Sequence, residues 1–294
     1  MRTWKCGKFE LPLGRKTYVM GIVNVTPDSF SGDGISGQTA LEHALHMVEA
    51  GADILDIGGE STRPGAQPVT EDEELRRVLP LVEALAPRVS VPLSVDTTKA
   101  AVARAALAAG AAIINDISAA TFEAQMLEVL AASDGGCILM HLRGTPQTMG
   151  WSTRTRKTEG GTRNDDVIAE IKAFWSERVA AAEKAGIAPE RIALDAGFGF
   201  GKSLEENLEI LRRGRELADF GFPTLSGTSR KSTIGKILGD APVSERLWGT
   251  AATVALAIAH GCDIVRVHDV REMAQVARVA DAVTRRAWQE SSTA

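Results

Sequence analysis

Eight short apolar runs rich in β-branched residues recur along the 294-residue chain and alternate with segments of helical spacing. The runs lie at 19–25, 52–57, 91–95, 112–115, 136–140, 191–194, 222–225 and 263–267. They lack the regular polar–apolar alternation of a half-exposed strand, which predicts a parallel sheet covered on both faces. Eight β/α units without a long interruption predict one α/β domain over residues 1–294, a closed (β/α)8 TIM barrel. An open doubly wound sheet is the alternative.

Good helix formers at helical spacing fill the segments between these runs. The predicted helices cover 40–49, 71–86, 99–108, 124–132, 167–185, 204–213, 245–260 and 271–286. Gly51, Gly110, Gly186 and Gly261 follow four of them, which is typical of a left-handed glycine that ends a helix. Residues 142–166 are rich in Gly, Thr, Arg and Pro and lack apolar periodicity, so we predict a mobile loop after the fifth strand.

Composition narrows the class of partner. The 33 basic and 38 acidic residues give a net charge of −5, which offers no field to attract nucleic acid or an anionic membrane. The three cysteines lack a C-x-x-C spacing and are predicted to be buried thiols. The first residues carry no apolar signal core, and no run of about 20 apolar residues occurs that could span a membrane. We therefore expect a cytoplasmic protein.

Nearly every predicted strand ends in a polar residue of a chemically useful kind. In a barrel these ends converge on one mouth, where barrel active sites are found. We interpret Asp56 alone as a helix cap or turn residue. The remaining candidates for the wall of a pocket are Asn24, Asp96, Asn115, Asp116, His141, Asp195, Ser229, Lys231, Arg266 and His268.

Two chemistries are present among these side chains. Asp96, Asn115 and Asp195 offer acceptors and amide donors that suit a polar heterocycle. Lys231, Arg266 and His268 suit a phosphate group. Arg266 and His268 stand two apart on one strand and therefore share a face, which Asn24 on the neighbouring strand approaches when the barrel closes.

Three glycine-containing loops follow the strands. Residues 26–34 and 58–65 are interpreted as lids over a substrate, with ordinary surface turns as the alternative. Residues 196–203 differ from a phosphate-binding G-x-x-x-x-G-K-[ST] loop only by Ala196 at the first position. Because Phe198 and Phe200 would crowd a backbone nest for phosphate, we prefer a sharp glycine turn that packs a phenylalanine at the pocket rim.

Seven motifs, in order, resemble those of the dihydropteroate synthase family. They span residues 20–30, 56–65, 94–97, 114–117, 197–202, 229–232 and 266–269. The resemblance implies a (β/α)8 barrel that joins 6-hydroxymethyl-7,8-dihydropterin diphosphate to p-aminobenzoate and forms 7,8-dihydropteroate and diphosphate in folate biosynthesis. It also implies a homodimer and a target of sulfonamides.

The resemblance also implies roles for individual residues. The pterin ring would be bound by Asp96, Asn115, Met140, Asp195, Phe200 and Lys231. The diphosphate would be bound by Asn24, Arg266 and His268, with Mg²⁺ bridging Asn24 and phosphate oxygens. The p-aminobenzoate site would be shaped by Phe30, Thr62, Arg63, Pro64 and Ser229. The residues with a catalytic role would be Asn24, Asp96, Lys231, Arg266 and His268.

The chemistry of these residue types agrees with that reaction. An arylamine is a weak nucleophile, so catalysis gains most by helping diphosphate to leave and by stabilising positive charge on the pterin methylene. Closed loops would keep water from the electrophile. Ser229 and the start of a helix near Arg230 would receive the p-aminobenzoate carboxylate.

Two departures from the family pattern and two alternatives accompany this interpretation. Gly32 is inserted before Asp33, and Ala196 stands in place of the usual proline.

A methyltetrahydrofolate-type methyltransferase would share the heterocycle-binding groups but holds no diphosphate, and Lys231, Arg266 and His268 argue against it. A non-catalytic pterin-binding homologue is the other alternative. The apolar residues of segments 245–260 and 271–286 are compatible with a dimer face.

Overall fold

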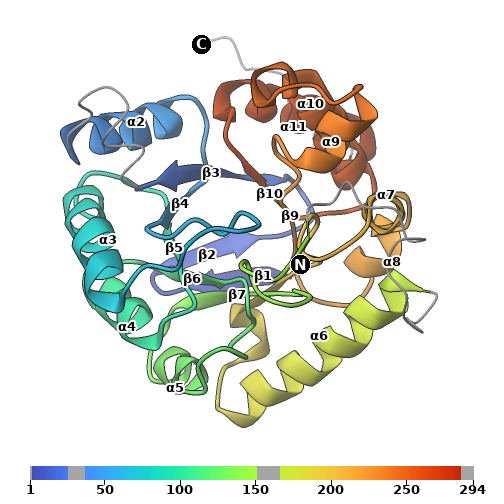
Figure 1. Ribbon diagram of the computed structural model, residues 1–294. Helices are drawn as coiled ribbons and strands as arrows, with labels where there is room; N and C mark the ends of the chain where they lie inside the picture. Colours follow the sequence, from blue (N-terminus) through green and yellow to red (C-terminus); the bar gives the residue numbers. More distant parts are fainter. Residues whose placement is uncertain (1, 26–36, 151–165, 286–294) are drawn as a thin grey trace.

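The computed structural model describes residues 2–25, 37–150 and 166–285 and shows a closed barrel of eight parallel strands in the order β10-β3-β4-β5-β6-β7-β8-β9 (Figure 1). The predicted TIM barrel is therefore confirmed, and each predicted strand is present. The strands are β3 Tyr18–Asn24, β4 Ile54–Gly58, β5 Leu93–Asp96, β6 Ile113–Asp116, β7 Gly136–Met140, β8 Ile192–Asp195, β9 Thr224–Ser226 and β10 Ile264–Val267.

Helices form a ring around the barrel (Figure 1). They are α2 Gly37–Glu49, α3 Glu71–Leu85, α4 Ala100–Ala108, α5 Gln125–Ala131, α6 Val167–Lys184, α7 Leu204–Arg212, α8 Gly214–Ala218, α9 Ser232–Ile237, α10 Leu247–Ala259 and α11 Val270–Thr284, with 3-10 turns η2 Pro189–Arg191 and η3 Val243–Glu245. Within the described ranges, every helix is too short or too polar to cross a membrane.

The local signals at the helix ends act as expected. Gly51, Gly110, Gly186 and Gly261 all have positive φ, between 96° and 111°, so the predicted left-handed helix ends are confirmed. At the start of α7, Ser203 and Glu206 form a reciprocal capping box in which each side chain accepts the other residue's backbone N–H. These caps fix where each helix begins and ends relative to the strand beside it.

A hairpin that the sequence analysis missed covers the amino-terminal end of the barrel. It consists of β1 Thr3–Cys6 and β2 Phe9–Pro12, which pair antiparallel, and it lies across the middle of the ring of helices in Figure 1. Trp4, fully buried, packs in a cluster with the first inward side chains of the strands and donates from Nε1 to the carbonyl of Arg191 at 3.0 Å. The hairpin therefore closes one end of the barrel with apolar side chains.

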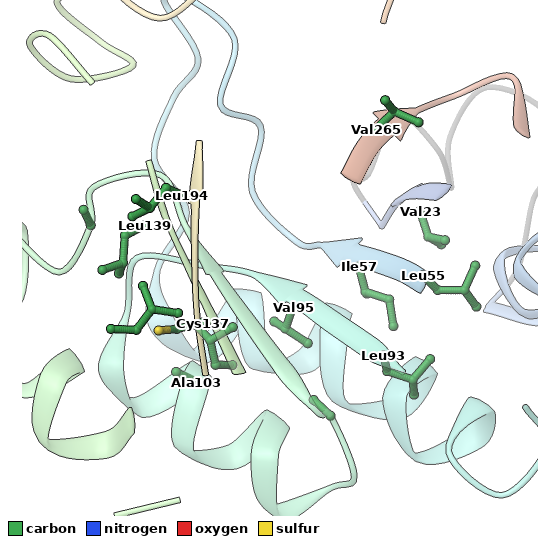
Figure 2. Close-up of a cluster of buried hydrophobic side chains, with 14 of the residues drawn as sticks. Val23, Leu55, Ile57, Leu93, Val95, Ala103, Cys137, Leu139, Leu194 and Val265 are labelled. Carbon is green, nitrogen blue, oxygen red and sulfur yellow. The ribbon is translucent and has the colours of Figure 1, made fainter. Parts of the chain in front are cut away.

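Side chains along each barrel strand alternate between the helices and the barrel interior. Figure 2 shows outward residues in the apolar layer under the helices, among them Val23, Leu55, Ile57, Val95 and Leu139. The residues between them point inward, and near the carboxyl ends of the strands most of these inward residues are polar. The cysteines Cys6, Cys137 and Cys262 are buried and free, as predicted.

Candidate active site at the carboxyl end of the barrel

The inward positions at the strand ends bring most of the predicted site residues to one mouth. Asp96 ends β5 and stands in register with Asn115 of β6, while Met140 of β7 stands in register with Asp195 of β8. All four are buried. Asn24 ends β3 and is exposed at the rim.

Arg266 of β10 is the centre of the interaction network inside this mouth. Its Nε donates to Asp56 Oδ2 at 2.6 Å, and its Nη2 donates to Asp96 Oδ2 at 2.9 Å. Asn115 Nδ2 donates to the same Asp56 oxygen at 3.1 Å. The interpretation of Asp56 as a cap or turn residue is therefore wrong: it is the inward residue between Leu55 and Ile57, in the middle of β4, and it is fully buried.

Burial sets the acid–base properties of the two aspartates that were predicted to bind a heterocycle. Burial raises the pKa of Asp96, an effect that Arg266 opposes and the nearby Asp56 reinforces. Burial also raises the pKa of Asp195, which Lys231 opposes. Asp195 Oδ1 in turn accepts the backbone N–H of Gly197 at 2.7 Å. Ligand groups that donate hydrogen bonds to these oxygens would oppose the effect of burial and stabilise the ionised carboxylates.

Lys231 lies beside Asp195, and the two phenylalanines of the glycine loop surround its amine. Its Nζ donates to the Phe198 carbonyl and stands 4.2 Å from the centre of the Phe200 ring. Burial lowers the pKa of Lys231 to about 7, although Asp195 counteracts this shift. Phe200 is half-buried, whereas Phe198 belongs to the core.

The loop of residues 196–203, which resembles a phosphate-binding loop in sequence, has a structural role. Lys202 is buried and its Nζ donates to the carbonyls of His141, Gly197 and Phe200 at 2.9–3.2 Å, so its ammonium group serves the backbone. Gly197, Gly199 and Gly201 all have positive φ. An added Cβ at Gly197 would lie 1.9 Å from the His141 carbonyl oxygen. The glycines are therefore required for the sharp, closely packed turn that the sequence analysis preferred.

Ser229 and His268 form a second polar pair at the mouth. Ser229 Oγ lies 3.0 Å from His268 Nδ1 and accepts the His268 backbone N–H at 3.2 Å. Burial lowers the pKa of His268 to about 4, and Arg266 and Arg230 add to the shift, so the imidazole is neutral near pH 7. Arg63 also contributes to this shift, which places its charge near His268. Helix α9 begins at Ser232, two residues beyond Arg230.

The loop after β4 forms one wall of a cavity of about 270 Å³ at this mouth. Thr62 and Asp96 line it together with Ile117, which the sequence analysis did not single out. The ammonium group of Lys99 forms ion pairs with Glu60 in this loop and with Glu74 on α3. These two contacts fasten the loop to the neighbouring helices. Pro64 is half-buried and Arg63 is exposed.

Some predicted residues fall elsewhere. His141 is wrong as a wall of the mouth, because its Nε2 faces Glu170 at 3.5 Å and its ring packs edge-on against Phe174 at 5.0 Å. Phe30, the 26–34 loop with Asp33, and residues 151–165 of the predicted mobile loop lie outside the described residues.

The donor set allows a test of the predicted Mg²⁺ site. Within the described ranges, no group of three or more His, Cys, Asp or Glu side chains could hold a metal ion. The amide oxygen of Asn24 is a hard ligand at the rim, and Mg²⁺ is commonly held by one or two protein oxygens plus substrate phosphates and water. The residues therefore fit an ion that arrives with a diphosphate, and its binding stays a prediction.

The carboxyl end of this (β/α)8 barrel holds two kinds of side chain. Buried acidic and amide groups suit the edge of a polar ring, and the cationic groups beside them suit an anionic substituent of that ring. Residues 20–268 match the family described as pterin binding enzyme, and the chain belongs to that family. Curated relatives that match about nine-tenths of its length or more are named dihydropteroate synthase. They include proteins of Synechocystis, 52% identical over 274 residues (92% of each chain), and of Escherichia coli K12, 47% identical over 267 residues (90% of this chain, 91% of that one).

Solved structures give the same result. The dihydropteroate synthase of Yersinia pestis, in a complex with a sulfonamide drug, has a TM-score of 0.86 and 42% identity and covers 96% of this chain and 98% of its own. That of Burkholderia cenocepacia, complexed with 7,8-dihydropteroate, has a TM-score of 0.84 and 42% identity over 96% of both chains. The assignment to dihydropteroate synthase, a transferase, is therefore confirmed.

Proposed function

We propose that this protein joins 6-hydroxymethyl-7,8-dihydropterin diphosphate to p-aminobenzoate, with release of diphosphate. The observation that carries the proposal is the meeting of Asp96, Asn115 and Asp195 with Lys231 and Arg266 inside one barrel mouth. Acceptors and an amide suit the edge of the pterin ring, and cations suit its anionic substituent. No covalent nucleophile is needed for this reaction.

The acidic and the cationic side chains would bind different parts of the substrate. Asp96 and Asp195 accept N–H groups of the pterin, and the half-buried Phe200 offers an aromatic surface beside the ring. Arg266 and Lys231 compensate the negative charge that grows on the diphosphate as its bond to the pterin methylene breaks. That compensation is strongest in a water-poor site, since opposite charges attract more strongly at low dielectric.

The second substrate would enter from the rim. Thr62, Arg63 and Pro64 on the loop after β4, with Ser229 beside His268, would shape the p-aminobenzoate site. The aryl amine then attacks the methylene as diphosphate departs, and the amine loses a proton afterwards. A sulfonamide presents an aryl amine with an anionic tail, so we expect it to compete at this same site.

Turnover separates this function from its alternatives. The purified protein is mixed with pterin diphosphate, p-aminobenzoate and Mg²⁺, and diphosphate release is measured with and without the arylamine. We expect release that requires both substrates. Methyl transfer from methyltetrahydrofolate would support the methyltransferase alternative, and pterin binding without turnover would support a non-catalytic homologue.

Matched variants test whether the mouth carries the reaction. Asp96→Asn removes one charged acceptor and is expected to lower kcat/KM about 10- to 100-fold. Asp263→Asn alters an equally buried aspartate that accepts the Thr224 backbone N–H before β10. The control should keep its kcat/KM; an equal loss in both variants would contradict a role specific to the mouth.

Mg²⁺ would be held by Asn24 and the diphosphate oxygens, where it would screen the charge of the leaving group. We expect chelation to abolish turnover and Asn24→Ala to raise the Mg²⁺ concentration needed for half-maximal rate. A variant that responds to Mg²⁺ like the wild type would remove Asn24 from the site.

A homodimer through α10 and α11 is the expected assembly. These helices pack on each other and expose large apolar side chains, with Trp248 at 78% and Val283 at 76% of their full exposure. Exposed apolar side chains on two adjacent helices are typical of a protein interface. Trp248→Glu should give monomers in sedimentation, whereas Arg104→Glu on the distant α4 should not.

We also expect the protein in the cytoplasm, which fractionation of cells would test.

A further inference from the structure

Asp56 is a fully buried carboxylate to which the proposed reaction assigns no role. One of its oxygens, Oδ2, accepts hydrogen bonds from Arg266 Nε at 2.6 Å and Asn115 Nδ2 at 3.1 Å. Its other oxygen, Oδ1, is buried without a hydrogen-bond partner among the described residues. A buried charge of this kind is costly unless an opposite charge accompanies it, and Arg266 is the charge in contact with it.

Arg266 serves a second carboxylate at the same time. Its Nη2 donates to Asp96 at 2.9 Å, so one guanidinium bridges two aspartates. The two aspartates differ in access, because Asp96 lines the cavity at the mouth and Asp56 lies behind it, with no exposed surface. A ligand that donates N–H groups to Asp96 therefore competes with the Arg266–Asp96 pair but does not reach the Arg266–Asp56 pair.

We propose that Asp56 is a positioning residue that holds Arg266 in the mouth while the guanidinium exchanges Asp96 for the diphosphate of the substrate. Asp56 acts through Arg266 and touches no substrate atom. This inference rests on the proposed function and adds to it a division between the two aspartates: Asp96 is the exchangeable partner of Arg266, and Asp56 is the permanent one.

The geometry gives the reason that a permanent partner matters. Asp56 binds Nε, at the inner edge of the guanidinium, which leaves the terminal nitrogens to change partners without moving the group. In Asp56→Asn, Asp96 becomes the carboxylate that pairs with Arg266 inside the mouth. The guanidinium would then follow Asp96, and reaching a diphosphate would break its last ion pair.

The experiment measures binding of inorganic diphosphate with Mg²⁺ by calorimetry in four proteins: wild type, Asp56→Asn, Arg266→Ala and the double variant. We expect Asp56→Asn to weaken diphosphate binding about 10- to 100-fold, the range for a hydrogen bond to a charged group. In the Arg266→Ala background the same substitution should have no further effect, because the group that it positions is gone. Asp263→Asn is the control and should bind diphosphate like the wild type.

Steady-state kinetics add a readout that a purely structural role would not move. We expect Asp56→Asn to raise KM for the pterin diphosphate and lower kcat, with KM for p-aminobenzoate unchanged. Equal losses of diphosphate affinity in both Arg266 backgrounds, or wild-type affinity in Asp56→Asn, would overturn the inference. If Asp56→Asn does not fold, Asp56→Ser, which leaves room for water, replaces it in the same cycle.

The two levels of the proposal can fail separately. Failure of the proposed function appears in the wild type, as no turnover and no diphosphate binding. Failure of the inference appears as an active wild type whose Asp56 variants bind diphosphate equally well.

Discussion

The two ends of the barrel are built from the same eight strands but from opposite kinds of side chain. The amino-terminal end is plugged by the β1–β2 hairpin, with Trp4, Cys6 and Leu11 in an apolar cluster. The carboxyl end buries the inward side chains of Asp56, Asp96, Asn115 and Asp195. Because burying apolar area stabilises a fold and burying charge costs free energy, the first end supports the charged arrangement at the second.

This contrast predicts that substitutions at the two ends affect different measurements. At the closed end they should lower the free energy of unfolding and leave KM unchanged. Substitutions at the mouth should lower activity. A substitution that removes one member of a buried ion pair should lower stability as well.

Arg266→Ala is expected to have the largest effect, since it acts on both measurements. It removes a cation from the leaving group, which we expect to lower kcat/KM about 10²- to 10³-fold. It also leaves the buried Asp56 unpaired, which should cost about 3–5 kcal/mol of stability. Steady-state kinetics and denaturant unfolding measure the two losses.

The double variant Asp56→Asn/Arg266→Ala separates these losses. Removal of the orphaned charge should restore much of the stability, whereas activity should stay low. A double variant as unstable as Arg266→Ala would show that Asp56 and Arg266 do not compensate each other.

Trp4→Ala should give the next largest effect, and only on stability. The side chain is fully buried and its Nε1 holds the Arg191 carbonyl, so truncation should cost about 3–5 kcal/mol in urea unfolding. KM for both substrates should match the wild type at a temperature where the variant is folded. A raised KM would mean that the plug shapes the mouth directly.

The mouth and the plug also differ in how much of each could be predicted from the sequence. The strand ends carry unusual polar residues, so Asp96, Asn115 and Asp195 were recognisable. Asp56 stood within an apolar run, and only its place between the outward Leu55 and Ile57 shows that it points inward. The hairpin was missed although residues 3–6 and 9–12 alternate around Gly7, since two four-residue strands give little periodicity.

Contacts between loops could not be predicted at all. Glu60 pairs with Lys99 across 39 positions, and no local pattern relates a loop residue to the start of a distant helix. His141 illustrates the opposite error. It follows a strand like the true site residues, but it succeeds the inward Met140 and therefore turns outward to Glu170.

Gly197→Ala tests the tight loop at the mouth, with a smaller expected effect. Both positive φ and the 1.9 Å approach to the His141 carbonyl oppose a methyl group there. Gly239→Ala is a matched control, because Gly239 has a similar φ of +75° but nothing within 4 Å of the added Cβ. We expect Gly197→Ala to lose about 1–3 kcal/mol more stability than the control, from the steric clash alone.

The KM for the pterin substrate should also differ between Gly197→Ala and Gly239→Ala. Displacement of the loop moves Phe200 and the Phe198 carbonyl away from Lys231, so Gly197→Ala should raise KM for the pterin substrate. Equal KM values in the two variants would show that the loop does not shape the mouth.

Over the first pH unit above neutrality, the smallest expected effect is a pH dependence that runs in opposite directions for activity and stability. Burial lowers the pKa of Lys231 to about 7, so its ammonium is lost as pH rises above that value. We expect kcat/KM, which reports the free enzyme, to fall at most about tenfold per pH unit above pH 7. In the unfolded chain Lys231 keeps its proton to about pH 10.4, so stability should rise between these two values, because the unfolded state binds more protons there. Lys231→Met should remove the activity trend and reduce the stability trend, whereas Lys16→Met, at the closed end beside Asp53, should retain both in full. The part of the stability trend that remains belongs to the buried Lys202, whose pKa burial also lowers to about 7. An alkaline decline that persists in Lys231→Met would assign the titration to another group and weaken the contrast between the two ends.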